Sequence, residues 1–78
     1  MAKRLPITNS IRRLRFDADE MTQQALAEKV GVTRQTILAI EAARYSPTLE
    51  LAFRIAEAFG KELGDVFQYV PEAPKADR

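Results

Sequence analysis

The 78-residue chain contains no cysteine, no histidine and no tryptophan. Without cysteine, neither a disulfide nor a thiolate metal site can stabilise the fold, and a chain of this length buries only a marginal hydrophobic core. Without histidine, the most common general base and metal ligand is missing. We therefore expect one small domain that is stabilised by helix packing, with a partner subunit as a further source of stability.

Residues that could carry out catalysis are sparse as well. The only serines are Ser10 and Ser46, and neither has a recognisable base in the sequence. The glycines are isolated, so no glycine-rich loop can cradle a phosphate. The carboxylates occur at spacings that suit solvated helix faces. This inventory argues against an enzyme and predicts no cofactor, no metal and no small-molecule ligand.

Long hydrophobic runs and a strong net charge are also missing. No stretch is long enough to span a bilayer, and residues 1–10 lack the apolar segment of a secretory signal, so we expect a cytoplasmic protein without a membrane partner. The net charge is only +1, but five basic residues precede the first acidic one: Lys3, Arg4, Arg12, Arg13 and Arg15. This asymmetry indicates a face that attracts anions, although an ordinary mixed surface is an equal alternative.

Hydrophobic periodicity and capping residues predict an all-α fold of five short helices. A first helix follows Asn9 or Ser10, and a short fifth one contains Leu63, Val66 and Phe67. Three threonines can each cap a helix between these two: Thr22 before residues 23–30, Thr33 before 34–43, and Thr48 before 49–59. Residues 68–70 could form a short strand. The expected organisation is a flexible basic arm (1–8), a folded domain (9–70) and a disordered tail (71–78).

Only Gly31, Val32 and Thr33 separate the second helix from the third. So short a turn forces the two helices to cross steeply, as in a helix-turn-helix. At about 100° per residue, Ile37 and Ile40 face the second helix. The opposite face of helix 34–43 points outward and carries Arg34, Gln35, Leu38, Ala39 and Ala42.

This outward face matches the chemistry of the DNA major groove. Arg34 can donate two parallel hydrogen bonds to guanine, and Gln35 can bond an adenine edge in the same way. Leu38 and Ala39 can contact thymine methyl groups. The alternatives are that Arg34 and Gln35 are ordinary solvated residues, and that Leu38, Ala39 and Ala42 are covered by the fifth helix or by a partner. The spacing of the two helices favours DNA.

The segment MTQQALAEKVGVTRQTILAIEAARYSPTLELAFRIAEAFG resembles the helix-turn-helix of Cro/cI-type (Xre-family) transcriptional regulators, especially the small stand-alone members. The resemblance extends over residues 10–69. It implies a compact five-helix, lambda-repressor-like domain of prokaryotic origin that binds operator DNA as a homodimer. By this resemblance, Arg34, Gln35, Leu38 and Ala39 would face bases, and five residues would contact phosphates: Gln23, Thr33, Thr36, Arg44 and Tyr45.

Four positions depart from the family pattern. The family often has glycine where this chain has Asp19 and Ala43, valine at Lys61 and glutamate at Ala25. A left-handed conformation at Ala43 would be strained. The sequence therefore leaves open a longer recognition helix, which would move Arg44 and Tyr45.

Arg15 and Glu41 lie next to the predicted core, on the first and third helices. Either charge would be costly to bury alone. The family resemblance implies that they form a partly buried ion pair, so we expect them to position the recognition helix and to have no catalytic role.

The size of the recognition surface predicts a homodimer. One recognition helix reads roughly three to five base pairs, too few to select one site among ~10⁶ competitors. Two copies would double the readout with their helices about 34 Å apart. On the fourth helix we expect Leu49 and Phe53 to face inward, and we expect the interface to contain Leu51, Ile55, Phe67 and Tyr69. The alternative is that the fifth helix covers Leu51 and Ile55 within one chain.

The sequence thus predicts a sequence-specific transcriptional regulator that binds double-stranded DNA. An antitoxin or a restriction-system controller would use the same DNA chemistry in another genetic context. A helical adaptor that binds protein through Leu38, Ala39 and Ala42 is the alternative from a different class. Steep salt dependence separates the DNA binders from the adaptor, because only phosphate contacts release counterions.

Overall fold

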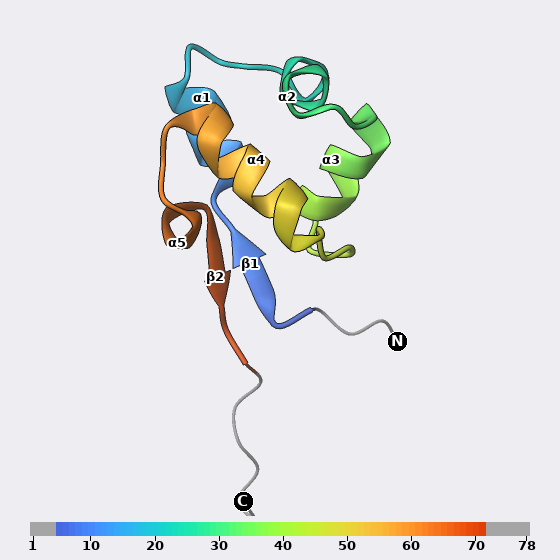
Figure 1. Cartoon of the computed structure of the whole chain (residues 1–78), viewed down its shortest axis with the longest axis vertical. Helices are drawn as coiled ribbons and strands as arrows, with labels where there is room; N and C mark the ends of the chain where they lie inside the picture. Colours follow the sequence, from blue (N-terminus) through green and yellow to red (C-terminus); the bar gives the residue numbers. More distant parts are fainter. Residues whose placement is uncertain (1–4, 72–78) are drawn as a thin grey trace, which may run out of the picture.

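The computed structural model describes residues 5–71. In this part of the chain, five helices surround one hydrophobic core, and a two-stranded sheet extends from it (Figure 1). The five expected helices are present. The prediction of an all-α fold is corrected, because two short strands pair antiparallel. The elements in chain order are β1 (Ile7–Asn9), α1 (Ile11–Asp17), α2 (Gln23–Val30), α3 (Arg34–Glu41), α4 (Leu49–Phe59), α5 (Leu63–Val66) and β2 (Phe67–Tyr69).

The predicted caps fix the ends of α2, α3 and α4. In each helix a threonine hydroxyl accepts a hydrogen bond from the backbone N–H three residues later, which satisfies a donor that the helix itself leaves free. The three distances are 2.9 Å for Thr22, 3.2 Å for Thr33 and 3.1 Å for Thr48. Gly31 and Gly60 end α2 and α4 with φ of 82° and 66°. At α1 the side chain of Asn9, rather than Ser10, accepts from the Ile11 N–H at 3.1 Å.

The sheet corrects the predicted N-terminal boundary. Ile7 pairs with Tyr69 and Thr8 with Gln68, so both residues belong to β1 and not to a flexible arm. Backbone bonds continue on both sides of the ladder, from Val70 N–H to the Pro6 carbonyl at 2.6 Å and from Ser10 N–H to the Val66 carbonyl at 2.8 Å. The short strand expected near residues 68–70 is present as β2. Residues 1–4 of the predicted arm and 72–78 of the predicted tail lie outside the described residues.

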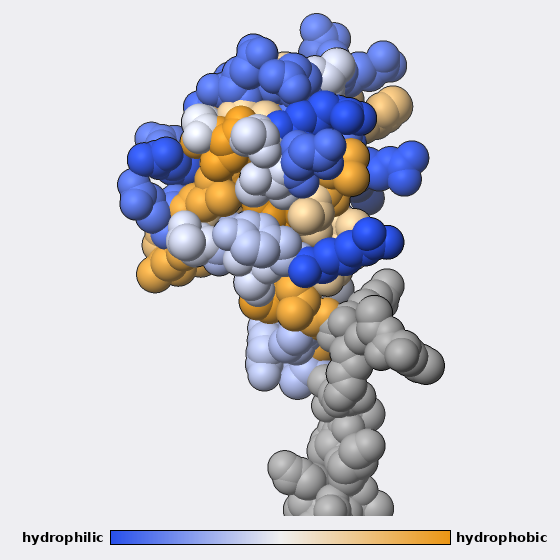
Figure 2. All heavy atoms as spheres, turned by 90° about the vertical axis from the view of Figure 1, so that its right-hand side faces the viewer, coloured by the Kyte–Doolittle hydropathy of each residue, from blue (hydrophilic) through white to orange (hydrophobic). Residues whose placement is uncertain are grey.

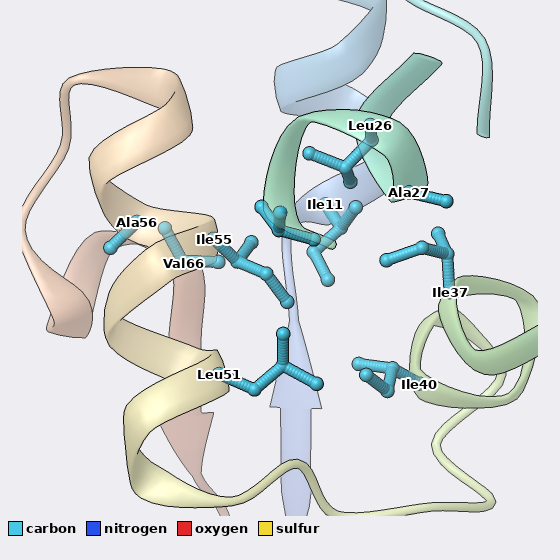
Figure 3. Close-up of a cluster of buried hydrophobic side chains, with 10 residues drawn as sticks. Ile11, Leu26, Ala27, Ile37, Ile40, Leu51, Ile55, Ala56 and Val66 are labelled. Carbon is cyan, nitrogen blue, oxygen red and sulfur yellow. The ribbon is translucent and has the colours of Figure 1, made fainter. Parts of the chain in front are cut away.

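The core corrects part of the predicted dimer interface. Ile55 has no exposed surface, and Leu51 is only 9% exposed. Figure 3 shows both side chains pointing from α4 toward the side chains of α3 and α2. They cannot line an interface, because the chain already covers them. The fully buried large side chains, from five different helices, are Ile11, Leu26, Ile37, Ile40, Ile55 and Val66.

The orientation of α4 differs from the predicted one for the same reason. Leu49 is 67% and Phe53 is 53% exposed, although both were expected to face inward. The helix carries apolar residues on both sides of its buried alanines, and only one side can face the core. In this fold the Leu51 side packs against the cluster, so the Leu49 side faces outward.

Ala43 adopts a left-handed conformation, with φ of 60°. This conformation costs an L-residue roughly 1–2 kcal/mol. Ala43→Gly is expected to remove that strain, partly offset by about 0.4–1 kcal/mol for the more flexible unfolded chain, and so to stabilise the protein by up to about 1 kcal/mol in urea unfolding. Ala42→Gly is the matched control: because Ala42 has φ of −81°, glycine there should only destabilise. Equal effects of the two substitutions would contradict the assignment of strain to Ala43.

Candidate nucleic-acid interface

Helices α2 and α3 form the predicted helix-turn-helix. The N–H groups of Gly31 and Val32 both bond to the Ala27 carbonyl, at 2.8 and 2.9 Å, which closes the end of α2. The left-handed Gly31 then redirects the chain into Thr33 and α3. Ala27 is fully buried between the helices, and its small side chain permits their close approach.

Helix α3 has one buried and one exposed face, as its periodicity predicted. Ile37 and Ile40 are 0% and 1% exposed, whereas Leu38 is 40% exposed. Arg34, Gln35 and Ala42 are also exposed, and Ala39 is half-buried. Figure 2 views the molecule from the side on which α3 lies and shows hydrophilic side chains around scattered hydrophobic ones. The predicted reading residues therefore lie on one face, where a large partner can reach them.

The start of α3 contributes two hydroxyl groups beside this face. The Oγ1 atoms of Thr33 and Thr36 lie 3.1 Å apart and are hydrogen-bonded, while Thr33 also caps the helix. A helix N-terminus offers free N–H groups and a positive dipole end. Its combination with two hydroxyls can accommodate a phosphate.

A partly buried ion pair holds the far end of α3 against α1. Arg15 Nε lies 2.6 Å from Glu41 Oε2, and Arg15 Nη2 donates to Glu41 Oε1 at 3.2 Å. The side chains are only 15% and 10% exposed. Arg15 Nη1 also donates to the Met21 carbonyl at 2.8 Å. The predicted pairing is confirmed, and it connects α1, the loop before α2, and α3.

Gln23 belongs to the same network. Its Nε2 donates to Glu41 Oε1 at 3.2 Å, so its side chain links the start of α2 to the end of α3. The residue was predicted from the family resemblance as a phosphate contact alone. No local sequence signal indicates the additional role, because the bond joins residues on two different helices.

Two further positioning residues were missed by the sequence analysis. Asn9 Nδ2 donates to the Ile40 carbonyl at 2.9 Å, which ties the end of β1 to the last turn of α3. Arg54 Nη1 donates to the Val30 carbonyl at 3.3 Å, at the end of α2. Both are long-range contacts to backbone carbonyls, and only the three-dimensional fold reveals them.

The loop after α3 presents Arg44 and Tyr45 beside the reading face. Arg44 N–H bonds to the Ala39 carbonyl at 3.0 Å, and Ala43 N–H bonds to Ile40 at 3.0 Å. These bonds end the helix at Glu41, so the alternative of a longer recognition helix is wrong. The side chain of Arg44 is exposed, and Tyr45 is 47% exposed.

A second exposed surface lies on α4, α5 and β2. We call it the α4–β2 patch and define it by Leu49, Phe53, Leu63 and Tyr69. Leu49 and Phe53 are one helical turn apart, and Tyr69 is 71% exposed. Leu63 lines a hollow with Leu49 and Tyr69 and another one with Phe53, so the patch is continuous.

Metal-ligand groups and membrane-spanning helices are absent from the described residues. Among residues 5–71, no group of three or more histidine, cysteine, aspartate or glutamate side chains could bind a metal ion. None of the helices described here has the length and apolar character needed to cross a membrane.

The two crossed helices, the capped start of α3 and its exposed face with Arg34 and Gln35 define a helix-turn-helix domain of the kind that binds DNA. The family model for helix-turn-helix proteins matches residues 11–66. The chain belongs to this family, the Cro/cI (Xre) type of DNA-binding transcription regulators.

Curated relatives come from both archaea and bacteria. An uncharacterized HTH-type transcriptional regulator of Methanothermobacter thermautotrophicus is 62% identical over 48 residues, 60% of this chain and 70% of the relative. One from Methanocaldococcus jannaschii is 55% identical over 49 residues, 63% of this chain and 74% of the relative. The Bacillus subtilis regulator YgzD is 52% identical over 46 residues, 59% of this chain and 70% of the relative.

A solved structure shows the same fold. The crystal structure of a candidate DNA-binding protein from Bacteroides fragilis superimposes with a TM-score of 0.70, at 21% sequence identity. The match covers 80% of this chain and 98% of that one.

Proposed function

We propose that this protein is a transcriptional regulator that reads the major groove of an operator as a homodimer. The observation that carries the proposal is the outward face of α3, where Arg34, Gln35 and Leu38 are exposed while Ile37 and Ile40 anchor the helix in the core. Arg34 and Gln35 are the residue types that bond guanine and adenine edges. The names of the relatives support regulation of transcription.

The remaining polar residues surround this face in positions suited to the DNA backbone. Thr33 and Thr36 lie at the positive end of α3, and Arg44 and Tyr45 follow its last turn. Gln23 is bound to Glu41 through its side chain and stands at the start of α2, where backbone N–H groups can meet a second phosphate. In the proposal these five residues fix the register, and the exposed residues of α3 read the bases.

The α4–β2 patch supports the homodimer and replaces the interface first predicted. The patch begins with Leu49, at the start of α4, shortly after the loop that carries Arg44 and Tyr45. In the proposal, a two-fold axis near the patch presents both copies of α3 to the same side of a duplex. Exposed apolar surface of this kind typically marks a partner site. Of the four interface residues expected from the sequence, Tyr69 belongs to this patch, and the half-buried Phe67 lines the same hollow as Tyr69.

The function is tested by selecting bound sequences from a random pool of DNA duplexes. The wild-type protein should recover a palindromic motif, whereas Arg34→Ala and Gln35→Ala should each relax base preference at one position per half-site. Both side chains are exposed, so circular dichroism should show an unchanged fold. Recovery of no motif, or of one motif unaltered in both variants, would refute the assignment.

Arg44→Ala is expected to weaken binding to all duplexes to a similar extent, because a phosphate contact carries no sequence information. The slope of log K against log salt should become shallower by about one unit. Fluorescence anisotropy at several salt concentrations measures both quantities. Lys61→Ala is the matched control, since Lys61 follows α4 at its end away from α3 (Figure 1). Because Lys61 also lines the hollow that contains Phe53 and Leu63, the slopes are compared on a single half-site, where Lys61→Ala should leave the slope unchanged. A changed motif with an unaltered slope would assign Arg44 to base reading instead.

A further inference from the structure

The exposed side of α1 combines two positive charges with an aromatic ring. Phe16 is 66% exposed, and Arg12 and Arg13 are exposed as well. The two arginines precede Phe16 by four and three positions, so each guanidinium is a helical neighbour of the ring. We call these three residues the α1 face. The opposite side of the same helix carries Ile11, which has no exposed surface.

The charges of the α1 face are available to an external partner. Arg12 takes part in none of the three ion pairs that the described residues form. Arg13 lies 3.8 Å from Asp17, but the two side chains are 82% and 58% exposed, so water screens their attraction. Both guanidinium groups can therefore bind a carboxylate from another molecule without breaking a strong contact within the chain.

The α1 face lies outside the two surfaces assigned above. The inward side of α1 carries Arg15, whose guanidinium reaches Glu41 at the end of α3, so the α1 face points away from α3. In Figure 1, α1 lies to the left of the core and α3 to its right. The hollow that the α1 face lines shares no residue with the two hollows of the α4–β2 patch. The α1 face is therefore free in the proposed homodimer on its operator.

We propose that the α1 face is a docking site for an acidic segment of another protein, one that carries an apolar side chain among its carboxylates. Carboxylates form charge-assisted, often bidentate hydrogen bonds with arginine, which Arg12 and Arg13 can donate. An apolar side chain from the partner would cover the ring of Phe16 and remove it from water. The backbone of a duplex would match the arginines, but its phosphates and sugars offer no apolar side chain to the ring.

Selection from a random peptide library tests this proposal on the intact protein, both free and bound to the duplex recovered from the random DNA pool. The enriched peptides should carry several acidic residues around one aromatic or aliphatic residue. A synthetic peptide of the enriched sequence, titrated into the labelled protein, should shift the backbone NMR signals of α1. Enrichment of no peptide, enrichment of peptides without acidic residues, or shifts confined to other elements would overturn the proposal.

Single substitutions assign the binding to side chains of the α1 face. Phe16→Ala should weaken binding of the selected peptide about tenfold, and Arg12→Ala should weaken it and make it less sensitive to salt. Lys29→Ala is the matched control, because Lys29 is an exposed cation on α2 and should leave the affinity unchanged. Alanine is a strong helix former, so circular dichroism should show an unchanged fold in all three variants. An equal loss in Lys29→Ala would reduce the binding to nonspecific charge attraction and overturn the docking site.

Duplex binding by the same variants separates this proposal from the proposed function. Arg12→Ala and Phe16→Ala should leave the selected DNA motif, the salt slope and the sedimentation coefficient unchanged. A shallower salt slope would assign the α1 face to DNA phosphates, and altered sedimentation would assign it to contact between copies of the chain; either result would overturn the docking proposal. Failure of the wild-type protein to bind any duplex would instead refute the proposed function, while the peptide result on the free protein would still decide the docking site.

Discussion

Glu41→Ala is expected to lower the free energy of unfolding by about 3–5 kcal/mol, a large part of the stability of so small a domain. The substitution leaves a partly buried arginine without its carboxylate, because the Arg15 side chain is only 15% exposed in the intact pair. It also removes the acceptor of Gln23 Nε2. Urea unfolding followed by circular dichroism measures the change.

Two control variants separate the cost of an unpaired, partly buried charge from the effect of simply removing a charged residue. Asp17→Ala removes an exposed pair with Arg13, in which the side chains are 82% and 58% exposed and 3.8 Å apart, so we expect a change of at most about 0.5 kcal/mol. The double variant Arg15→Met with Glu41→Leu removes both partly buried charges and should recover much of the stability lost in Glu41→Ala. If the double variant is as unstable as the single one, the unpaired charge is not the cause.

The helix boundaries around the site were predictable because they depend on local chemistry. A threonine before α2, α3 and α4 caps each helix, and Gly31 and Gly60 end two of them, as expected. The two faces of α3 follow from the spacing of Ile37 and Ile40. These features involve residues within a few positions of one another, so periodicity and capping rules suffice.

Features that depend on distant segments were not predictable. The strands β1 and β2 have three residues each, too few for alternation to be visible, and they pair residues about sixty positions apart in the chain. The side of α4 that faces the core depends on how α1, α2 and α5 pack around it. The sequence therefore identified two apolar stripes on α4 but assigned the wrong one to the interior.

In the candidate site, the exposure of the side chains could be predicted from the sequence better than their hydrogen-bond partners could. The exposure of Arg34, Gln35 and Leu38 follows from helical geometry, and the bond between Arg15 and Glu41 was expected from the family resemblance. The link from Gln23 to Glu41 was not, because a glutamine at a helix start has no preferred long-range acceptor. At Ala43 the family pattern favours glycine, yet the chain adopts the left-handed conformation with an alanine. The backbone hydrogen bonds of Ala43 and Arg44 to the end of α3 keep this strained conformation.

Phe53→Glu is expected to give a folded monomer that binds a palindromic duplex roughly 10²–10⁴-fold more weakly, since the second half-site would no longer be held by the same assembly. Phe53 is 53% exposed in the single chain, so a carboxylate there remains hydrated. At a two-fold interface the same substitution places two negative charges in or near one contact. Sedimentation velocity measures the loss of the dimer. Binding to a palindrome and to a single half-site measures the loss of affinity.

Ile55→Glu is the matched variant, two positions further along α4. Ile55 has no exposed surface, so a glutamate there would bury an unpaired charge and should unfold the domain. Circular dichroism on both variants therefore separates the two stripes of α4: Phe53→Glu should retain helix and lose the dimer, and Ile55→Glu should lose helix. A Phe53→Glu protein that remains dimeric would place the interface outside the α4–β2 patch. Unchanged binding to the single half-site by the Phe53→Glu monomer would show that each α3 reads its bases independently, with dimerisation supplying the additional affinity for the palindrome.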